Sequence, residues 1–321
     1  MQNAIERLDF AYQNFFRTCH SGGGFPKFAR KGRDKSILFK IVKLISGTTI
    51  KLPKIGELKL FKDAPMYGVP KIATIIKEPT GYFVCVVCDE VDKRSIIQNQ
   101  DENQVCGIDM GISFFCADSN GNMIENPRHF LKYEKQLRIE NRSLSRKKKG
   151  SKRWKKQARK LAMLQHRIAN IRKDFLHKES TSLAKKYHTI FVEDLKIANM
   201  ARNKNLSKHI LDCGWGMFRT MLAYKTNVVL VNPRYTSQTC NECGKVDSKS
   251  RISRDEFECV SCGHVSHADV NAAKSVLVKG QKFLLDKETA SAQAFATGEG
   301  IAINRESKAI AYALVEEPHV L

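Results

Sequence analysis

Four cysteines place the strongest constraint on how this chain folds. They form two Cys-x2-Cys pairs, Cys240 with Cys243 and Cys259 with Cys262, and a short polar segment separates the pairs. Two tight turns with this spacing bring four thiolates to the corners of a tetrahedron, which is the arrangement that structural Zn²⁺ sites use. Four unrelated core cysteines are a much weaker interpretation. The spacing therefore predicts a zinc-binding module with a short hairpin between its two halves.

The charge of the chain predicts a polyanionic partner. The 321 residues include 55 Lys and Arg against 33 Asp and Glu, a formal net charge of +22. This excess favours nucleic acid over an anionic membrane. No stretch approaches the roughly 18 to 20 apolar residues of a membrane helix, and the start of the chain does not resemble a signal peptide. We expect a cytoplasmic protein, nucleoid-associated when bound to DNA, whose remaining cysteines are reduced and mostly in the core.

The pattern of apolar residues changes along the chain. Residues 1–17 have helical spacing, and from Ile37 to Val91 short β-rich runs follow one another. A small β-barrel or a sandwich is the simplest way to close so many short strands. Strands and helices then alternate through the second half of the chain, which favours an α/β fold.

A strongly basic segment lies between residues 142 and 160. It carries eleven Lys and Arg, no acid, and one aromatic residue near its middle. Such a run is often only a solvated flexible segment, but the overall charge and the stacking capacity of the aromatic ring favour a nucleic-acid contact. The candidate contacts are Arg146, Lys147, Lys148, Lys149, Lys152, Arg153, Trp154, Lys155, Lys156 and Arg234.

Three carboxylates are candidates for a second metal site. Asp109 lies inside an apolar strand, Glu193 ends another strand, and Asp269 follows the cysteine module at the start of a helix. A buried unpaired acid such as Asp109 is costly and favours a functional role. Asp194 beside Glu193 leaves the choice of acid there open, and Asp269 alone would be read as a helix N-cap. If the three converge, they suit Mg²⁺ or Mn²⁺ and metal-dependent phosphodiester hydrolysis.

These motifs resemble the TnpB (OrfB) family of insertion sequences, which is related to compact type V CRISPR effectors. The resemblance rests on ordered motifs across most of residues 10–280, in chain order Tyr12-x2-Phe15-Phe16, Gly24-Phe25-Pro26, Gly-Ile-Asp109-Met-Gly-Ile, Val-Glu193-Asp-Leu, Tyr-Thr236-Ser237-Gln-Thr-Cys240, the second cysteine pair, and Asp269-x-Asn271-Ala-Ala. It implies an RNA-guided DNA endonuclease that binds a guide RNA and target DNA. Asp109, Glu193 and Asp269 then match the catalytic triad, which binds Mg²⁺ or Mn²⁺, and the four cysteines match the ligands of a structural Zn²⁺.

The same resemblance implies a domain organisation. It predicts an α/β protein with an RNase H-like (RuvC) nuclease domain, an inserted zinc ribbon, a preceding β-barrel wedge domain and a residual helical segment. The expected parts are a recognition segment (1–30), the wedge domain (31–103), the nuclease domain with a basic helical insertion (104–235), the zinc ribbon (236–266), the last nuclease helix (267–280) and a poorly ordered tail (281–321).

Two departures from the family pattern modify these expectations. We expect the chain to lack most of the recognition lobe and the first wedge strand. The connection between Tyr224 and Val228 is also shorter than in relatives, and we expect it to strain or displace the following strand. A non-cutting nucleic-acid-binding remnant is the alternative function. A cut-and-paste transposase that joins DNA ends itself is a weaker one.

Overall fold

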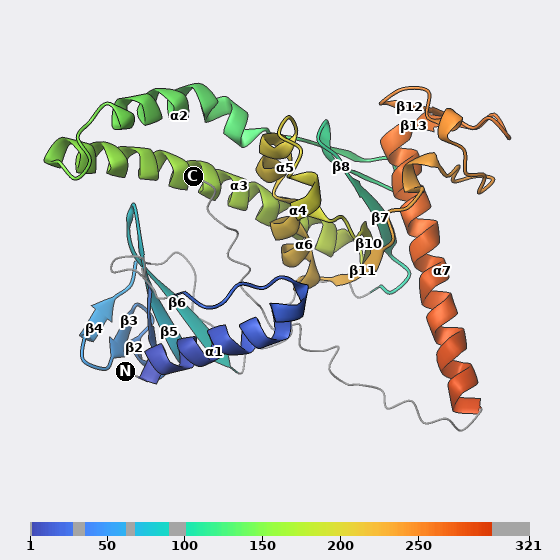
Figure 1. The fold of residues 1–321 in the computed structure, drawn as a ribbon. Helices are drawn as coiled ribbons and strands as arrows, with labels where there is room; N and C mark the ends of the chain where they lie inside the picture. The colour runs from blue at the N-terminus through green and yellow to red at the C-terminus, as the bar shows by residue number, and fades with distance from the viewer. Residues whose placement is uncertain (1, 28–35, 62–67, 90–100, 297–321) are drawn as a thin grey trace. The chain divides into compact units, whose positions relative to one another are not determined.

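The protein divides into two compact units. The computed structural model describes residues 2–27, 36–61, 68–89 and 101–296, which Figure 1 draws as a ribbon. The first unit contains Met1–Gln98 and Arg128–Lys185, and the second contains Asn99–Pro127 and Lys186–Leu321. Both units combine helices with strands, as an α/β fold requires. No helix among the described residues is long and apolar enough to cross a membrane.

The strands of the first unit form two antiparallel three-stranded sheets, ordered β1-β5-β6 and β2-β3-β4. Their bounds are β1 (Ser36–Phe39), β2 (Lys43–Ser46), β3 (Thr49–Leu52), β4 (Gly56–Lys59), β5 (Val69–Glu78) and β6 (Gly81–Asp89). Ile50 and Leu52 from one sheet and Ala73 from the other are fully buried in one cluster. The two sheets thus share a core, as a sandwich or a barrel needs. Cys85, expected in the core, is exposed because β6 is an edge strand.

Three helices complete the first unit: α1 (Gln2–Thr18), α2 (His129–Ser145) and α3 (Lys152–Lys186). A 3-10 turn, η1 (Cys19–Ser21), follows α1. The expected N-terminal helix is therefore confirmed. Leu137 from α2 packs with Leu161 and Ile168 from α3 in a separate buried cluster. The basic segment 142–160 covers the end of α2, the connection and the first turns of α3, so much of it is helical.

A five-stranded sheet forms the centre of the second unit, with the order β11-β10-β7-β8-β9. The bounds are β7 (Val105–Met110), β8 (Phe114–Asp118), β9 (Met123–Glu125), β10 (Thr189–Glu193) and β11 (Asn227–Val231). β7, β8 and β9 form an antiparallel meander, whereas β10 is parallel to both β7 and β11. The helices of this unit are α4 (Ile197–Met200), α5 (Ser207–Cys213), α6 (Trp215–Ala223) and α7 (Ala268–Ala296).

Helix α7 crosses the sheet at very close range, which Figure 1 shows beside β7 and β10. Two glycines allow this approach. A Cβ at Gly107 on β7 would overlap the backbone oxygen of Ala273, and a Cβ at Gly280 on α7 would overlap the ring of Phe191 on β10. Gly280 therefore does not end the helix, as the sequence suggested. α7 continues to Ala296, and residues 297–321 of the expected tail lie outside the described part of the chain.

The short connection between α6 and β11 fits without strain, contrary to expectation. Thr226 is buried, and its hydroxyl contacts the backbone oxygens of His188 at 2.7 Å and Tyr187 at 3.0 Å. Neither Lys225 nor Thr226 has a positive φ. The side chain of Thr226 thus holds the turn against the start of β10, and β11 pairs in register with that strand.

Candidate active site and metal centres

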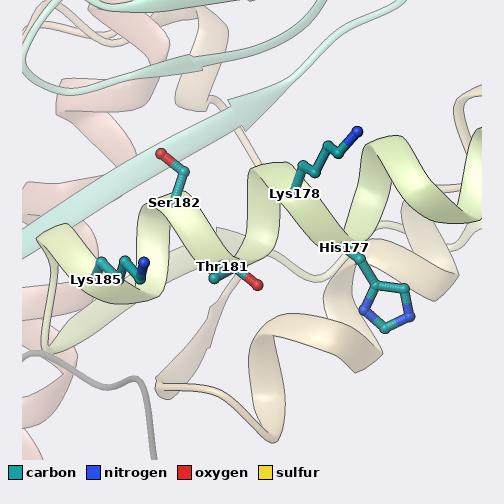
Figure 2. A pocket seen from close by; sticks show the side chains of 5 residues that line it. All are labelled: His177, Lys178, Thr181, Ser182 and Lys185. Atoms are coloured by element: carbon teal, nitrogen blue, oxygen red, sulfur yellow. The ribbon is translucent and has the colours of Figure 1, made fainter. Parts of the chain in front are cut away.

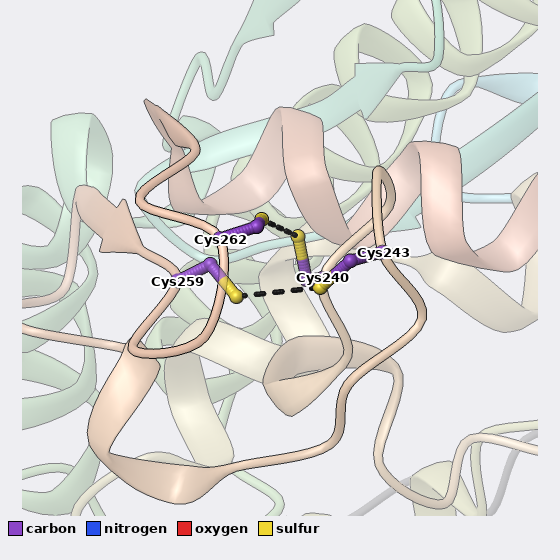
Figure 3. Close-up of side chains that lie close together, drawn as sticks. All are labelled: Cys240, Cys243, Cys259 and Cys262. Carbon is purple, nitrogen blue, oxygen red and sulfur yellow. Dashed lines mark hydrogen bonds between the residues drawn. The ribbon is translucent and has the colours of Figure 1, made fainter.

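The four cysteines converge from two matching turns (Figure 3). In each turn a glycine follows the second cysteine with a positive φ, 73° at Gly244 and 69° at Gly263. The N–H of each glycine donates to the carbonyl of the first cysteine of its pair, at 3.0 Å and 2.9 Å respectively. The module between η3 (Thr236–Gln238) and α7 also contains η4 (Ser248–Ser250), β12 (Glu256–Glu258) and β13 (Val265–His267).

The spacing of the sulfur atoms suits a tetrahedral ion. All four Sγ atoms lie within 4.8 Å of one another, with Cys240 to Cys262 at 3.7 Å and Cys243 to Cys259 at 3.6 Å. A tetrahedron with Zn–S bonds of about 2.3 Å has sulfurs about 3.8 Å apart. Backbone N–H groups of Cys262 and Ser261 lower the pKa of Cys259, which favours the thiolate that a metal needs. The donor set and its size therefore fit Zn²⁺.

Asp109 lies on the central strand β7, one residue beyond the last register pair with β10. Part of the residue remains open to solvent, but protein atoms surround its carboxylate. Burial raises the pKa of Asp109 to about 8, and the negative charges of Glu193 and Asp269 raise it further, whereas Arg251 lowers it. The ionised form of Asp109 is thus unfavourable in the absence of a cation.

Glu193 and Asp269 are brought to Asp109 by two different elements. Val192 pairs with Ile108, so Glu193 at the end of β10 lies level with Asp109 on the neighbouring strand. Asp269 occupies the first turn of α7, and its Oδ2 lies 3.9 Å from where a Cβ of Gly111 would be. The structure therefore brings the three carboxylates together, as expected if they share one function.

Three side chains that the sequence did not single out surround these acids. The Thr236 hydroxyl donates to Oε1 of Glu193, and Arg251 from the cysteine module forms an ion pair with Asp269 at 3.5 Å. Lys279 of α7 faces Glu193, and burial lowers its pKa. Burial raises the pKa of Glu193, and Thr236 and Lys279 oppose that shift. A lysine among apolar residues of α7 was a readable signal, whereas Arg251 offered none locally.

The cysteine module is fastened to the helix that carries Asp269. Asn271 is fully buried, and its amide donates to the backbone oxygen of Thr239 at 2.8 Å while its oxygen accepts from the N–H of Asn241 at 3.1 Å. Ser275 donates to the same Thr239 oxygen at 3.0 Å. The first cysteine turn and the start of α7 are therefore held as one piece.

The expected nucleic-acid contacts lie in both units. Residues 146–156 belong to the first unit, where most of the basic side chains are exposed and Trp154 is half-buried. Arg234 belongs to the second unit and is exposed. A separate hollow of about 430 Å³ lies beside α3, as Figure 2 shows. Its lining residues, none of which is a carboxylate or a thiol, are His177, Lys178, Thr181, Ser182 and Lys185. The hollow therefore does not offer a metal site of its own.

Comparison with known proteins identifies the family. The family model OrfB_IS605, described as "Probable transposase", matches residues 85–204, and a Cas12f1-like TNB domain matches residues 215–276. InsQ of Escherichia coli (strain K12), named as an RNA-guided DNA endonuclease, is 33% identical over 306 residues, which are 88% of this chain and 75% of InsQ. The chain belongs to the TnpB (OrfB) family.

Other members and relatives agree with this family. A protein of Streptomyces pristinaespiralis, also named as an RNA-guided DNA endonuclease, is 31% identical over 96% of this chain and 75% of its own length. TnpB-like protein L770 of Acanthamoeba polyphaga mimivirus is 28% identical over 70% of this chain and 46% of its own. Among solved structures, a Cas12f1–sgRNA–target DNA complex matches with a TM-score of 0.49 and 14% identity, over 82% of this chain and 67% of that chain.

Proposed function

We propose that this protein is a transposon-encoded, RNA-guided DNA endonuclease that cuts DNA at Asp109, Glu193 and Asp269. Its membership of the TnpB family supports the reaction. The sheet supports an RNase H-like (RuvC) nuclease domain, because a three-stranded antiparallel meander continues into two parallel strands on one side. The carboxylates come from the central strand, its parallel neighbour and the helix that crosses them.

The convergence of three carboxylates is the observation that carries this proposal. Like charges so close together, in surroundings that already disfavour ionisation, are stable only when a cation neutralises them. Carboxylate oxygens are the ligands that Mg²⁺ and Mn²⁺ prefer, so we assign Asp109, Glu193 and Asp269 to one or two such ions. A divalent ion there would supply activation of water and stabilisation of the charge that develops on the phosphate.

The neighbouring side chains have supporting roles. Thr236 donates to one oxygen of Glu193 and so orients the carboxylate, leaving its other oxygen for a ligand. Arg251 and Lys279 place positive charge beside Asp269 and Glu193, where an anionic phosphodiester would approach. These residues hold the site and attract the substrate.

The four cysteines would hold a structural Zn²⁺. Its role in the reaction is indirect, because the cysteine module carries Arg251 and fastens the start of α7 through Asn271. Loss of the ion would free both contacts. In this proposal the ribbon (236–266) and the last nuclease helix are one mechanical unit, and the helix reaches beyond the expected residue 280.

The basic surfaces would grip the nucleic acids by their backbones. The exposed cations of residues 146–156 and Arg234 suit contacts with a guide RNA and its duplex with the target strand, which depend on phosphate charge rather than base identity. We assign residues 1–30 to a recognition segment and 31–103 to a wedge domain, whose two sheets share one core.

The decisive experiment isolates the protein with its RNA. The full chain is purified from cells, the bound RNA is sequenced, and DNA matching that RNA is incubated with the complex in Mg²⁺ or in EDTA. Cleavage of matched DNA in Mg²⁺ alone is expected, with mismatched DNA left intact. Asp109→Ala should abolish cleavage while the same RNA remains bound.

Two other outcomes overturn the proposal. RNA and DNA binding without cleavage, in wild type as in Asp109→Ala, would indicate a non-cutting nucleic-acid-binding protein. Joining of transposon ends to a second DNA molecule would indicate a transposase. Full cleavage by Asp109→Ala would refute the assignment of the triad.

A further inference from the structure

Tyr235 has an unusual backbone conformation beside the carboxylate site. Its φ of 62° and ψ of 7° lie in the left-handed region, which is uncommon for a residue with a Cβ and least expected for a bulky one. Among the described residues, three that are not glycine have a positive φ, and Tyr235 is the aromatic one. Such outliers persist when the surrounding structure over-determines them, and they cluster at functional sites.

The hydrogen bonds on both sides of Tyr235 show what holds it. Its carbonyl accepts from the N–H groups of Gln238 at 3.0 Å and Thr239 at 2.9 Å. The next residue, Thr236, is buried and donates to Glu193, and the preceding residue, Arg234, accepts at its carbonyl from Lys279. Tyr235 therefore stands between two residues that are each fixed to the surroundings of Glu193.

The side chain of Tyr235 points away from this anchored backbone. The residue is 55% exposed although large apolar surface usually favours burial. The guanidinium carbon of Arg234, also exposed, lies 5.9 Å from the centre of the ring, within the range of a cation–π contact. A flat exposed ring next to a cation is the combination that single-stranded nucleic acids use, with a base on the ring and a phosphate near the cation.

We propose that Tyr235 and Arg234 form a subsite for one unpaired nucleotide of the DNA strand that enters the carboxylate site. The base stacks on Tyr235, Arg234 contacts an adjacent phosphate, and the strand is thereby positioned for its next phosphodiester to reach Glu193 and Asp109. This inference rests on the proposed nuclease function and adds a positioning residue to it. The strained backbone at Tyr235 keeps the ring at a fixed distance from Thr236 and Glu193.

The test compares strands with and without bases. The full chain carries Asp109→Asn so that DNA stays intact, and fluorescence anisotropy measures its affinity for a short thymidine strand and for the same strand with abasic sugars. Tyr235→Ala should weaken binding of the thymidine strand roughly 5- to 100-fold and leave the abasic strand unchanged. Tyr235→Phe is the matched control, since it keeps both the ring and the Cβ, and should bind as tightly as Tyr235.

A second variant guards against loss of folding. Tyr235→Gly removes the ring and relieves the positive φ, so it should fold at least as stably and show the same selective loss. Equal weakening of both strands, or no change in either, would overturn the subsite. Cleavage by the chain with Asp109 restored is measured separately. Cleavage without base-dependent binding at Tyr235 refutes the subsite alone, and base-dependent binding without cleavage refutes the nuclease function alone.

Discussion

Replacement of Asp109 by asparagine is expected to stabilise the metal-free protein. Burial and the charges of Glu193 and Asp269 raise the pKa of Asp109 from its ordinary 3.8 to about 8. At pH 7 the folded protein must then hold a proton that the unfolded chain releases. Each pKa unit corresponds to about 1.36 kcal/mol, so the roughly 3 units between the ordinary value and pH 7 amount to about 4 kcal/mol. Asparagine removes that penalty.

The pH dependence gives the sign of the effect. Because the folded state binds more protons than the unfolded state, the stability of the metal-free wild type falls as pH rises from about 4 to about 8. Below that window Asp109 is protonated in both states, and Asp109→Asn should change little. Saturating Mg²⁺ should reverse the order, since an ion that binds only the folded wild type stabilises it.

The assay uses a tryptophan inside the same unit as the sheet. The chain contains 2 tryptophans, and Trp215 is buried in the second unit whereas Trp154 lies in the first. In a Trp154→Phe background, urea unfolding in EDTA followed by Trp215 fluorescence reports the second unit alone. The difference between Asp109 and asparagine is measured across the pH window and then repeated with Mg²⁺.

Asp118 supplies a matched control on the neighbouring strand. It is also buried, but it accepts hydrogen bonds from Asn122 at 2.8 Å and 2.7 Å and from Tyr187 at 3.1 Å. Asp118→Asn should therefore destabilise the unit by about 2 kcal/mol, because charge-assisted donors lose their acceptor. If Asp109→Asn destabilises the metal-free unit as Asp118→Asn does, the carboxylates are not in electrostatic conflict and the reasoning is wrong.

Other parts of the molecule give further expectations. Cys259→Ser should lower the zinc content of the purified protein and destabilise the ribbon, as metal analysis and proteolysis would measure, and unchanged zinc would exclude the site. Thr236→Val should lower the cleavage rate about tenfold with the unfolding curve preserved, whereas Thr236→Ser should restore it; equal loss in both would refute the role of the hydroxyl. Replacing the cations at 146–149 with glutamine should reduce the salt dependence of RNA binding by up to about 0.9 in the log–log slope per lost phosphate contact, and an unchanged slope would show that the segment does not touch RNA.

The metal sites were readable from the sequence where the signal was local. Two Cys-x2-Cys turns specify the positions of their own sulfurs, so the quartet needed no long-range knowledge. Asp109 and Glu193 stood out because an acid inside or at the end of an apolar strand is costly. Asp269 was ambiguous, because an acid in the first turn of a helix is equally typical of a cap. Only the course of α7 over β7, permitted by Gly107, brings it to the other acids.

Contacts made across the fold were not readable in the same way. Arg251 approaches Asp269 from a different part of the cysteine module, and Thr236 reaches Glu193 from beyond another strand. Gly280 misled the prediction of where α7 ends, because glycine commonly terminates helices but here provides room for Phe191. The short connection before β11 looked strained by length alone, and the hydrogen bonds of Thr226 explain why it is not.

The position of Mn²⁺ tests the central claim most directly. Crystals of the protein with its RNA are soaked in Mn²⁺, and anomalous scattering locates the ions. A peak within coordination distance of Asp109, Glu193 and Asp269 is expected, and it should disappear in Asp109→Asn. Saturating Mn²⁺ that leaves these carboxylates without an anomalous peak, or a peak that persists in Asp109→Asn, would contradict the assignment of the three acids as one catalytic metal site.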